Sequence, residues 1–342
     1  MLERSKGLMH LVVLGAGATC AAFPYGDREG NRPVPAMNNF MEKTGLIEKF
    51  PNNIEEIKQH NNLEELYSLW HEDSSKKQLC EKLENEIYSY FSKLNALEYL
   101  NLYDVLLLSL TNRDVIATFN WDPFLSQSYK KISSRFTHDL PRIIFLHGNV
   151  SMGYCPDCKI IGYREDVCEK CKKPLVKLNL LYPTKEKNYT DNIYIKSAWE
   201  EFSMCIQHAS LITFFGYSAP PSDEGAMERM TKAFKRDRLS SLKQIQIINI
   251  DDETLLRERY SSFTDKYNHV DVVKSFYESF MALYPHRSAD YIFSSTMLLN
   301  PGYSIDERDK ISGLSLFLVG NGNFLYSKIF RHSTLKTCMM IA

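Results

Sequence analysis

The chain has 342 residues, enough for one large domain or two ordinary domains with a sizeable core. With 44% hydrophobic and 24% charged residues, it is neither fibrous nor compositionally disordered. Its 41 basic and 42 acidic residues give a net charge of −1, which disfavours a protein that binds nucleic acid through a basic surplus.

The chain begins with a basic stretch and an apolar run at 8–14, a pattern that signal peptides and buried strands share. The run is short, contains His10 and passes directly into Gly15-Ala16-Gly17. We therefore expect a buried first strand. Because no apolar stretch approaches the roughly 18 residues that span a bilayer, we also expect a soluble, cytoplasmic protein.

Short and nearly continuous apolar runs recur along the chain, which predicts strands buried on both faces, as in a parallel sheet covered by helices. The runs are 11–14, 115–119, 143–146, 211–215 and 245–250, with 270–273 as a sixth candidate. Several of them end in Gly, Asn or Asp. Ligands of doubly wound sheets bind beyond the carboxyl ends of the strands, so chemistry is expected at these endings.

Between the first two runs, apolar residues repeat at helical spacing, which predicts helices that face the core. They are Leu63, Leu66, Tyr67 and Trp70, followed by Leu79, Leu83, Ile87, Phe91 and Leu94. The sequence therefore predicts an α/β fold, a Rossmann-like doubly wound parallel sheet with a helical insert at 36–112. The pattern weakens in the C-terminal segment 286–342, to which we assign no role.

Two Cys-x-x-Cys pairs are the most specific motif in the chain: Cys155, Cys158, Cys168 and Cys171. They supply four thiolates for tetrahedral zinc, with Zn–S distances of about 2.3 Å. Four protein ligands close the coordination shell, so we expect structural Zn2+ in a zinc-ribbon module at 150–185, which unfolds without the metal. Gly162 is expected to turn the intervening loop. The alternative is four unrelated buried thiols.

The first two strands end in polar motifs. After the first comes Gly-Ala-Gly-Ala-Thr (15–19), where glycines permit a tight turn and a close approach to a pyrophosphate. A tight turn without a ligand explains these residues nearly as well. After the second comes Thr-Phe-Asn-Trp-Asp (118–122), in which alternation puts Asn120 and Asp122 on one side of the chain. Asp122 is equally suited to cap a helix that begins at Pro123.

Three further strand endings carry candidate residues. His147 follows the third strand and is either a base that works near neutral pH or a structural imidazole. Gly-Tyr-Ser (216–218) leaves the fourth strand and Asn249 ends the fifth. In nucleotide-binding sheets such endings hydrogen-bond a ribose, and their structural alternatives are a loop and a helix cap.

Taken in order, Gly-Ala-Gly, Thr-x-Asn-x-Asp, His-Gly, the cysteine pairs, Gly-Tyr-Ser and Ile-Asn resemble the sirtuin (silent information regulator) family over residues 8–275. The resemblance implies a Rossmann-like NAD-binding domain formed by 1–149 and 186–285, which carries the zinc module. It implies that Asn120 and Asp122 hold nicotinamide and its ribose, with His147 as general base. The other cofactor-binding residues that it implies are Gly15, Ala16, Gly17, Thr19, Arg28, Gly216, Ser218 and Asn249.

Three segments depart from the protein-deacylating sirtuins. Phe119 replaces a Gln before the Asn, and the segment 22–28 replaces Gly-Ile-Pro-Asp-Phe-Arg. Leu-Leu-Tyr-Pro-Thr-Lys (180–185) replaces a Phe-Gly-Glu strand that pairs with the acyl-lysine peptide, and Pro cannot donate to a sheet ladder. Tyr-Pro-Thr-Lys and Gly-Tyr-Ser-x-Pro-Pro-x-Asp look like the divergent, mainly bacterial branch, whose members hydrolyse NAD in antiphage defence.

We therefore expect an NAD+ glycohydrolase that releases nicotinamide and ADP-ribose and serves as an antiphage effector by depleting NAD+. One alternative is a protein deacylase or mono-ADP-ribosyltransferase, and another is a non-catalytic subunit that binds NAD or ADP-ribose. The expected partners are NAD+ and a second copy of the chain or a defence-complex protein, with neither a membrane nor direct nucleic-acid contact.

Overall fold

The computed structural model describes residues 8–28, 30, 32–137, 139–183, 189, 192–220, 223–237, 240–264 and 269–297. The C-terminal segment beyond residue 297 and the pair Thr184-Lys185 lie outside these ranges. Among the described residues, no helix is long and apolar enough to cross a membrane.

Six parallel strands form the central sheet, in the order β3-β2-β1-β7-β8-β9. Numbered along the chain, this is the 3-2-1-4-5-6 order of the Rossmann fold. The predicted strands are confirmed, with ends that differ by one or two residues. They are β1 (His10–Leu14), β2 (Val115–Thr118), β3 (Arg142–Phe145), β7 (Leu211–Phe215), β8 (Gln244–Ile248) and β9 (His269–Val273).

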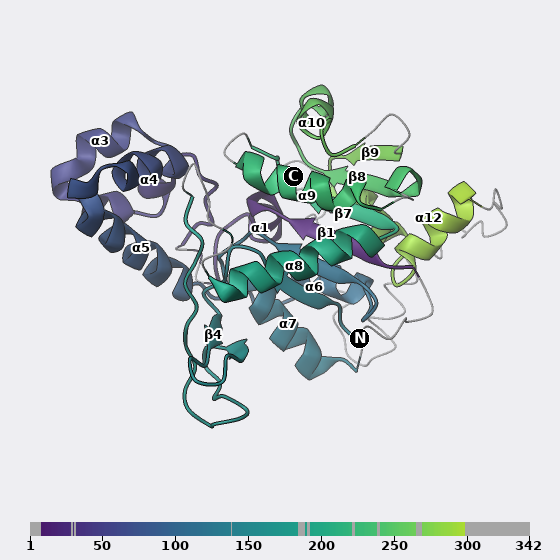
Figure 1. Cartoon of the computed structure of the whole chain (residues 1–342), viewed down its shortest axis with the longest axis horizontal. Helices are drawn as coiled ribbons and strands as arrows, with labels where there is room; N and C mark the ends of the chain where they lie inside the picture. Colours follow the sequence, from purple (N-terminus) through teal and green to yellow (C-terminus); the bar gives the residue numbers. More distant parts are fainter. Residues whose placement is uncertain are drawn as a thin grey trace.

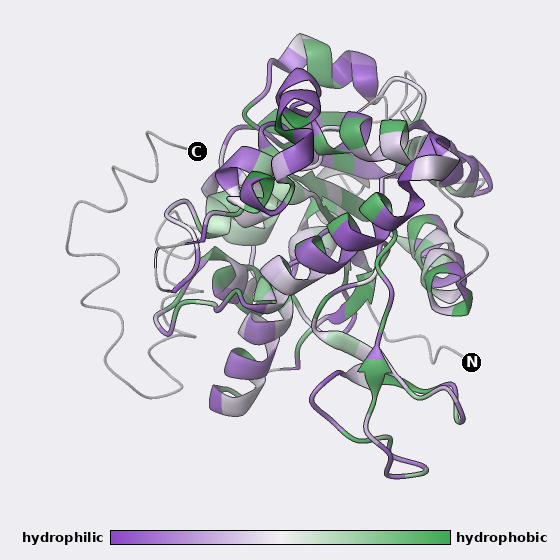
Figure 2. Ribbon diagram, turned by 90° about the vertical axis from the view of Figure 1, so that its left-hand side faces the viewer, coloured by the Kyte–Doolittle hydropathy of each residue, from purple (hydrophilic) through white to green (hydrophobic). Residues whose placement is uncertain are grey.

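Alternate residues of each strand enter two different hydrophobic cores. Val12 and Leu14 of β1 join the core packed by the insert helices, whereas Leu11 and Val13 join the core under α8 and α9. Figure 1 shows α8 and α9 lying across one face of the sheet, and Figure 2 shows that the central strands are mostly hydrophobic. Burial on both faces explains why these strands lack polar alternation.

Helices follow the strands and fill the stretch between β1 and β2. They are α1 (Ala16–Ala22), α2 (Phe40–Lys43), α3 (Ile54–Gln59), α4 (Leu63–Glu72), α5 (Lys77–Ser92), α6 (Leu102–Ser109), α7 (Phe124–Arg135), α8 (Ile193–His208), α9 (Glu224–Lys235), α10 (Glu253–Arg259), α11 (Phe280–Leu283) and α12 (Ser288–Met297).

The helical insert lies beside the sheet, where α3, α4 and α5 form a separate lobe in Figure 1. Helix α4 begins at Leu63 because the Asn62 side chain accepts the amides of Glu64 and Glu65. Its predicted apolar stripe is buried and joins the core that covers Val12 and Leu14. The helical spacing of that stripe was therefore a correct indication of core-facing helices.

A small antiparallel sheet, in the order β5-β4-β6, carries the cysteines. Its strands are β4 (Met152–Tyr154), β5 (Ile161–Tyr163) and β6 (Val176–Lys177). The turn predicted at Gly162 is wrong, because this residue lies within β5 opposite Gly153. A Cβ atom at Gly162 would lie 2.9 Å from Leu175 Cδ1, so a larger residue there would require the Leu175 side chain to move.

His10 anchors α12 at the amino-terminal edge of the sheet. Its ring nitrogens lie 2.7 Å from Ser288 Oγ and 2.8 Å from Thr213 Oγ1. Complete burial lowers the pKa of His10 to about 3, so the imidazole is neutral. His10, the one polar residue in the apolar run 8–14, therefore links β1 to α12, the last helix of the described chain.

Candidate functional site

The turns after β1 and β7 pack directly against each other at the carboxyl edge of the sheet. Gly15 and Gly17 donate their amides to the carbonyls of Phe215 (3.0 Å) and Gly216 (2.9 Å). A Cβ atom at Gly15 would lie 2.5 Å from the Gly216 carbonyl oxygen, and Gly216 has a φ of +62°. Glycine is needed at both positions. This packing gives the glycine turn a structural role besides the predicted ligand role.

Thr19, in α1 just after this turn, is the centre of a polar network. Asn120 Nδ2 donates to Thr19 Oγ1 and to the Gly15 carbonyl, both at 2.9 Å. Thr19 Oγ1 donates to Asp122 Oδ2 (2.9 Å), and the Tyr103 hydroxyl lies 2.6 Å from the same Thr19 oxygen. Asn120 and Asp122 therefore lie on one side of the chain, as their alternation predicts.

The chemistry of the partners fixes the direction of these hydrogen bonds. The Gly15 carbonyl can only accept, so the Asn120 amide nitrogen faces it and the Asn120 carbonyl oxygen points away. Ionised Asp122 can only accept, so Thr19 donates to it and accepts from Tyr103 and Asn120. Thr19, Tyr103 and Asp122 are buried, whereas Asn120 is partly exposed. The network thus uses the Nδ2 of the partly exposed Asn120 and directs its acceptor, Oδ1, away from the Gly15 carbonyl.

Asp122 is a buried carboxyl group that is still largely ionised at neutral pH. Burial raises its pKa to about 6, and hydrogen bonds from Thr19 and from the Phe124 amide (3.1 Å) oppose that rise. Helix α7 begins at Phe124, one residue later than predicted, with Pro123 just outside it. The carboxylate therefore both accepts an amide of the first helical turn and places a negative charge beside Asn120, where it favours a cation.

His147 reaches the same edge from the side of Phe119. It is buried after β3, and its ring packs edge-on against Phe119, with 4.9 Å between the centroids. Phe119 belongs to the core under α8 and α9, whereas the next residue, Asn120, bonds Thr19. Consecutive side chains thus diverge, and His147 shares the side of Phe119 rather than that of Thr19.

Asn149 connects the segment after β3, which carries His147, to the backbone of Asn120 and Asp122. Its Nδ2 donates to the carbonyl oxygens of Asp122 (2.6 Å) and Asn120 (3.3 Å), and it is almost completely buried. Neither Asn149 nor Tyr103 was singled out from the sequence. Asn149 follows His-Gly at a strand end, which was a usable signal. Tyr103 belongs to the largely apolar helix α6, where no sequence pattern marks it.

The residues expected to hold the adenosine half follow two neighbouring strands. The Gly216 amide donates to the Ile248 carbonyl (2.9 Å), which joins the ends of β7 and β8. Asn249 Oδ1 accepts the Asp251 amide (3.0 Å). Arg259 bonds both the Ser218 carbonyl (3.2 Å) and Asp251 (3.1 Å).

The two remaining cofactor-binding candidates are Ala16 and Arg28, and they lie in different places. Ala16 opens α1 directly after the glycine turn. Arg28 is exposed and pairs with Glu98 at 2.8 Å, while its amide donates to the Asn95 carbonyl. These contacts belong to the surface of the helical insert rather than to the network around Thr19.

The four cysteines of the small sheet converge on one point. Their sulfur atoms all lie within 4.8 Å of one another, with Cys155 and Cys171 at 3.5 Å. Tetrahedral zinc with Zn–S bonds of about 2.3 Å requires sulfurs roughly 3.8 Å apart, so the donor set is compatible with structural zinc. Cys158 also directs its amide at the Cys155 sulfur (3.4 Å), which stabilises a thiolate.

The two cysteine pairs have the same backbone geometry. Lys159 donates its amide to the Cys155 carbonyl and Lys172 to the Cys168 carbonyl, both at 2.8 Å. Both lysines have positive φ, +57° and +62°. This repetition on the two sides of one centre is what two metal-binding turns require, and it fits the predicted ligand set.

Comparison with known proteins finds neither a matching family model nor a matching curated protein. Among solved structures, one from work on the mechanism and regulation of Sir2 enzymes has a TM-score of 0.40 and 13% identity, covering 91% of this chain and 94% of its own.

Two further structures give similar values. A Sir2 homologue in complex with NAD has a TM-score of 0.42 and 13% identity, covering 85% of this chain and 91% of its own. A structure from work on sirtuin substrate affinity has a TM-score of 0.40 and 17% identity, covering 85% and 95%. At TM-scores below 0.5 these likenesses support no argument, so the fold and the roles of single residues rest on the geometry of this chain.

Proposed function

We propose that the chain is an NAD+ glycohydrolase that cleaves the nicotinamide–ribose bond. The observation that carries this proposal is the network of Asn120, Thr19 and Asp122 beside the glycine turn that follows β1 and packs against the turn after β7. That turn lies where the strand order reverses, the position at which doubly wound sheets bind nucleotides. We further propose that 1–149 and 186–285 form the NAD-binding unit and 150–185 the zinc module.

The chemistry requires few groups, because nicotinamide leaves from NAD+ as a neutral molecule. The bond from ribose C1′ to the pyridinium nitrogen breaks, and its electron pair stays on that nitrogen, so no general acid is needed. Buried Asp122 favours the positive charge that develops on the ribose. Asn120 Oδ1 accepts a hydrogen bond from the carboxamide or a ribose hydroxyl. Water then bonds to C1′ and loses a proton, which we assign to His147 on the Phe119 side of the same sheet edge.

The other predicted residues have supporting roles in this proposal. Gly15, Ala16, Gly17 and Thr19 line the pyrophosphate and its ribose, and Gly216, Ser218 and Asn249 hold the adenosine half. Arg28 would have to leave its ion pair with Glu98 to contact the cofactor. Zinc, bound by the four cysteines, has no open coordination position and serves to fold its module.

The segment that follows β6 at the end of the zinc module favours water over a peptide as the acceptor. Residues 178–183, which we term the strap, are fastened at several points. The Leu181 amide donates to the His147 carbonyl (2.9 Å), and the Tyr182 hydroxyl donates to the Glu84 carbonyl (3.0 Å). The Pro183 carbonyl accepts from Ser68 (3.3 Å). Two of these bonds occupy main-chain groups, the Leu181 amide and the Pro183 carbonyl, in the segment with which a peptide strand would have to pair.

The test is to analyse the products that zinc-loaded protein forms from NAD+, with and without an acetyl-lysine peptide. We expect nicotinamide and ADP-ribose in equal amounts in both cases. O-acetyl-ADP-ribose, or labelled protein, would select the deacylase or transferase. A raised melting temperature without turnover, even with partner proteins added, would select a binding subunit. His147→Ala should abolish release, and His208→Ala, at an exposed histidine, should leave it unchanged.

The proposed biological role is antiphage defence by NAD+ depletion, in which the enzyme is held inactive until it is triggered. Its test is the cellular NAD+ level after phage infection of bacteria that express the chain. NAD+ should fall with the unmutated chain and stay constant with Asn120→Ala. An unchanged NAD+ level with both would contradict the role while leaving the activity in vitro open to the product assay.

A further inference from the structure

Trp121 lies between the two residues proposed to hold nicotinamide and its ribose, and only 6% of its surface is exposed. The ring packs edge-on against Phe91 of α5, with centroids 6.0 Å apart, and at a tilt against Tyr182 of the strap, at 5.5 Å. Its Nε1 has no hydrogen-bond partner among the described residues. Packing against other side chains is therefore what holds the indole in place.

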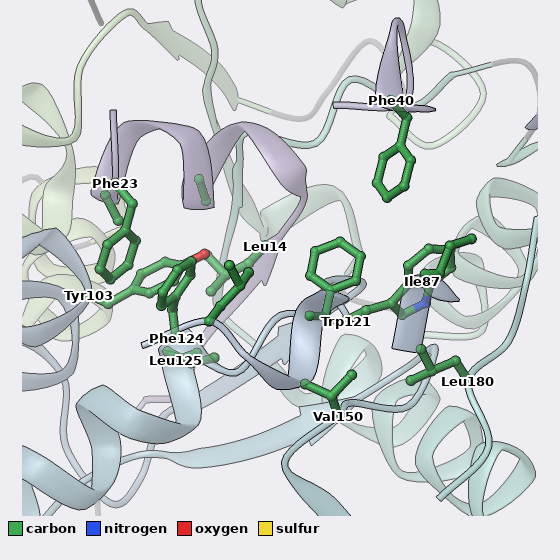
Figure 3. Packing of buried hydrophobic residues seen from close by; sticks show 14 of the residues in the cluster. Leu14, Phe23, Phe40, Ile87, Tyr103, Trp121, Phe124, Leu125, Val150 and Leu180 are labelled. Carbon is green, nitrogen blue, oxygen red and sulfur yellow. The ribbon is translucent and has the colours of Figure 1, made fainter. Parts of the chain in front are cut away.

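These contacts connect Trp121 to the helical insert. Tyr182 stacks on Tyr67 of α4 at 5.6 Å, and Tyr67 also bonds Glu84 of α5 at 2.5 Å. Figure 3 shows Trp121 near Val150, Ile87 and Leu180, apart from the group formed by Phe23, Tyr103 and Phe124. An aromatic array thus runs from α4 through the strap and Trp121 to α5.

The backbone around Trp121 is held by hydrogen bonds from Asn149 and Val150, which follow β3. Its carbonyl accepts the Val150 amide at 3.1 Å, and the Asn149 side chain bonds the carbonyls of Asn120 and Asp122 on either side. Because the three residues are consecutive, a shift of the Trp121 backbone, to which the packed indole is attached, would move Asn120 and Asp122 as well. Displacements of about 1 Å can cost on the order of 100-fold in rate.

We propose that Trp121 is a positioning residue, and that Tyr182 and Phe91 hold its indole so that the helical insert sets the geometry of Asn120 and Asp122. This rests on the proposed NAD+ cleavage. Trp121 would act through its two neighbours and would not touch the ribose. The insert would then control the rate of the chemical step more than the affinity for NAD+.

The experiment measures kcat and KM for nicotinamide release by full-length, zinc-loaded protein. Trp121→Leu and Tyr182→Leu are each expected to lower kcat about tenfold while KM changes less than about twofold. The double variant should be little slower than either single one, because both remove the same support. Trp121→Phe, which keeps an aromatic ring, should recover most of the rate. Tyr99→Leu, at an exposed aromatic residue, is the matched control.

Hydrogen exchange of the backbone amides supplies a readout that does not depend on activity. In Tyr182→Leu, amides of residues 119–125 should exchange faster while those of β1 stay protected. If the unmutated protein releases no nicotinamide but exchange accelerates, the coupling stands and the proposed function falls. If release is observed and Tyr182→Leu changes neither exchange nor kcat, or the two effects multiply, the coupling is wrong.

Discussion

Replacing Asp122 by Asn is expected to stabilise the protein at neutral pH. Burial raises the pKa of Asp122 from 3.8 to about 6, so the folded chain holds the proton more tightly than the unfolded chain between these values. The free energy of unfolding therefore falls as the pH rises through this window. A shift of about 2 units corresponds to about 3 kcal/mol at pH 7.5, and roughly half of that at pH 5.

The net gain is smaller than this limit, because the amide group introduced by the substitution would offer Thr19 a donor where the carboxylate offers an acceptor. We expect Asp122→Asn to raise the free energy of unfolding by about 1 to 3 kcal/mol at pH 7.5, and by less at pH 5. Urea unfolding of zinc-saturated protein at both pH values measures the change. Asp139→Asn, at an exposed carboxyl group, is the matched control.

The pH dependence is what tests the reasoning. If Asp122→Asn destabilises the protein equally at pH 5 and pH 7.5, the carboxylate affects stability through its hydrogen bonds and not through the cost of burying its charge. The same substitution should abolish nicotinamide release, because a neutral amide does not stabilise a cationic transition state. A variant that is more stable and inactive would identify Asp122 as a residue kept for function at the expense of stability.

Three further predictions concern the zinc centre, the glycine turn and Tyr103. Purified protein should contain one zinc ion bound by four sulfurs at about 2.3 Å. Cys168→Ser should lose the zinc and make the zinc module sensitive to proteolysis. A module that resists proteolysis equally well without the metal would contradict a structural role. Gly216→Ala should cost several kcal/mol, about 3 or more, because a Cβ atom would overlap the backbone of Gly17 and Ala18. Gly30→Ala, where nothing lies within 4 Å, should cost only about 1 kcal/mol by urea unfolding, and equal losses would refute the packing argument. Tyr103→Phe should lower kcat about tenfold with little change in melting temperature, since only the hydroxyl bonded to Thr19 is lost, and an unchanged kcat would remove Tyr103 from the network.

Much of the fold followed from local sequence patterns. Continuous apolar runs predicted strands that bury both faces, and the paired cysteines predicted a centre on which four sulfurs do converge. The spacing of Leu63, Leu66 and Trp70 predicted a core-facing helix. These patterns succeed because each depends on neighbouring residues within one element.

The site was harder to predict, because it depends on contacts between distant elements. Alternation placed Asn120 and Asp122 on one side but could not show that Tyr103, in a helix of the insert, completes their network. The glycines after β1 suggested a ligand, whereas their close partner is Gly216, about 200 residues away in sequence. Gly162 suggested a turn because its packing against Leu175 has no local signal. Burial of Trp121 against the strap is likewise a property of the assembled fold.

The central claim is that Asn120, oriented by Thr19 and Asp122, binds the nicotinamide side of NAD+ for cleavage. Its most direct test is the rate at which zinc-loaded protein releases nicotinamide from NAD+, compared between Asn120→Ala and Asn61→Ala, an exposed asparagine. We predict release by the unmutated chain and by Asn61→Ala, and none by Asn120→Ala at a temperature at which all three proteins are folded. Equal release by both variants would contradict the account.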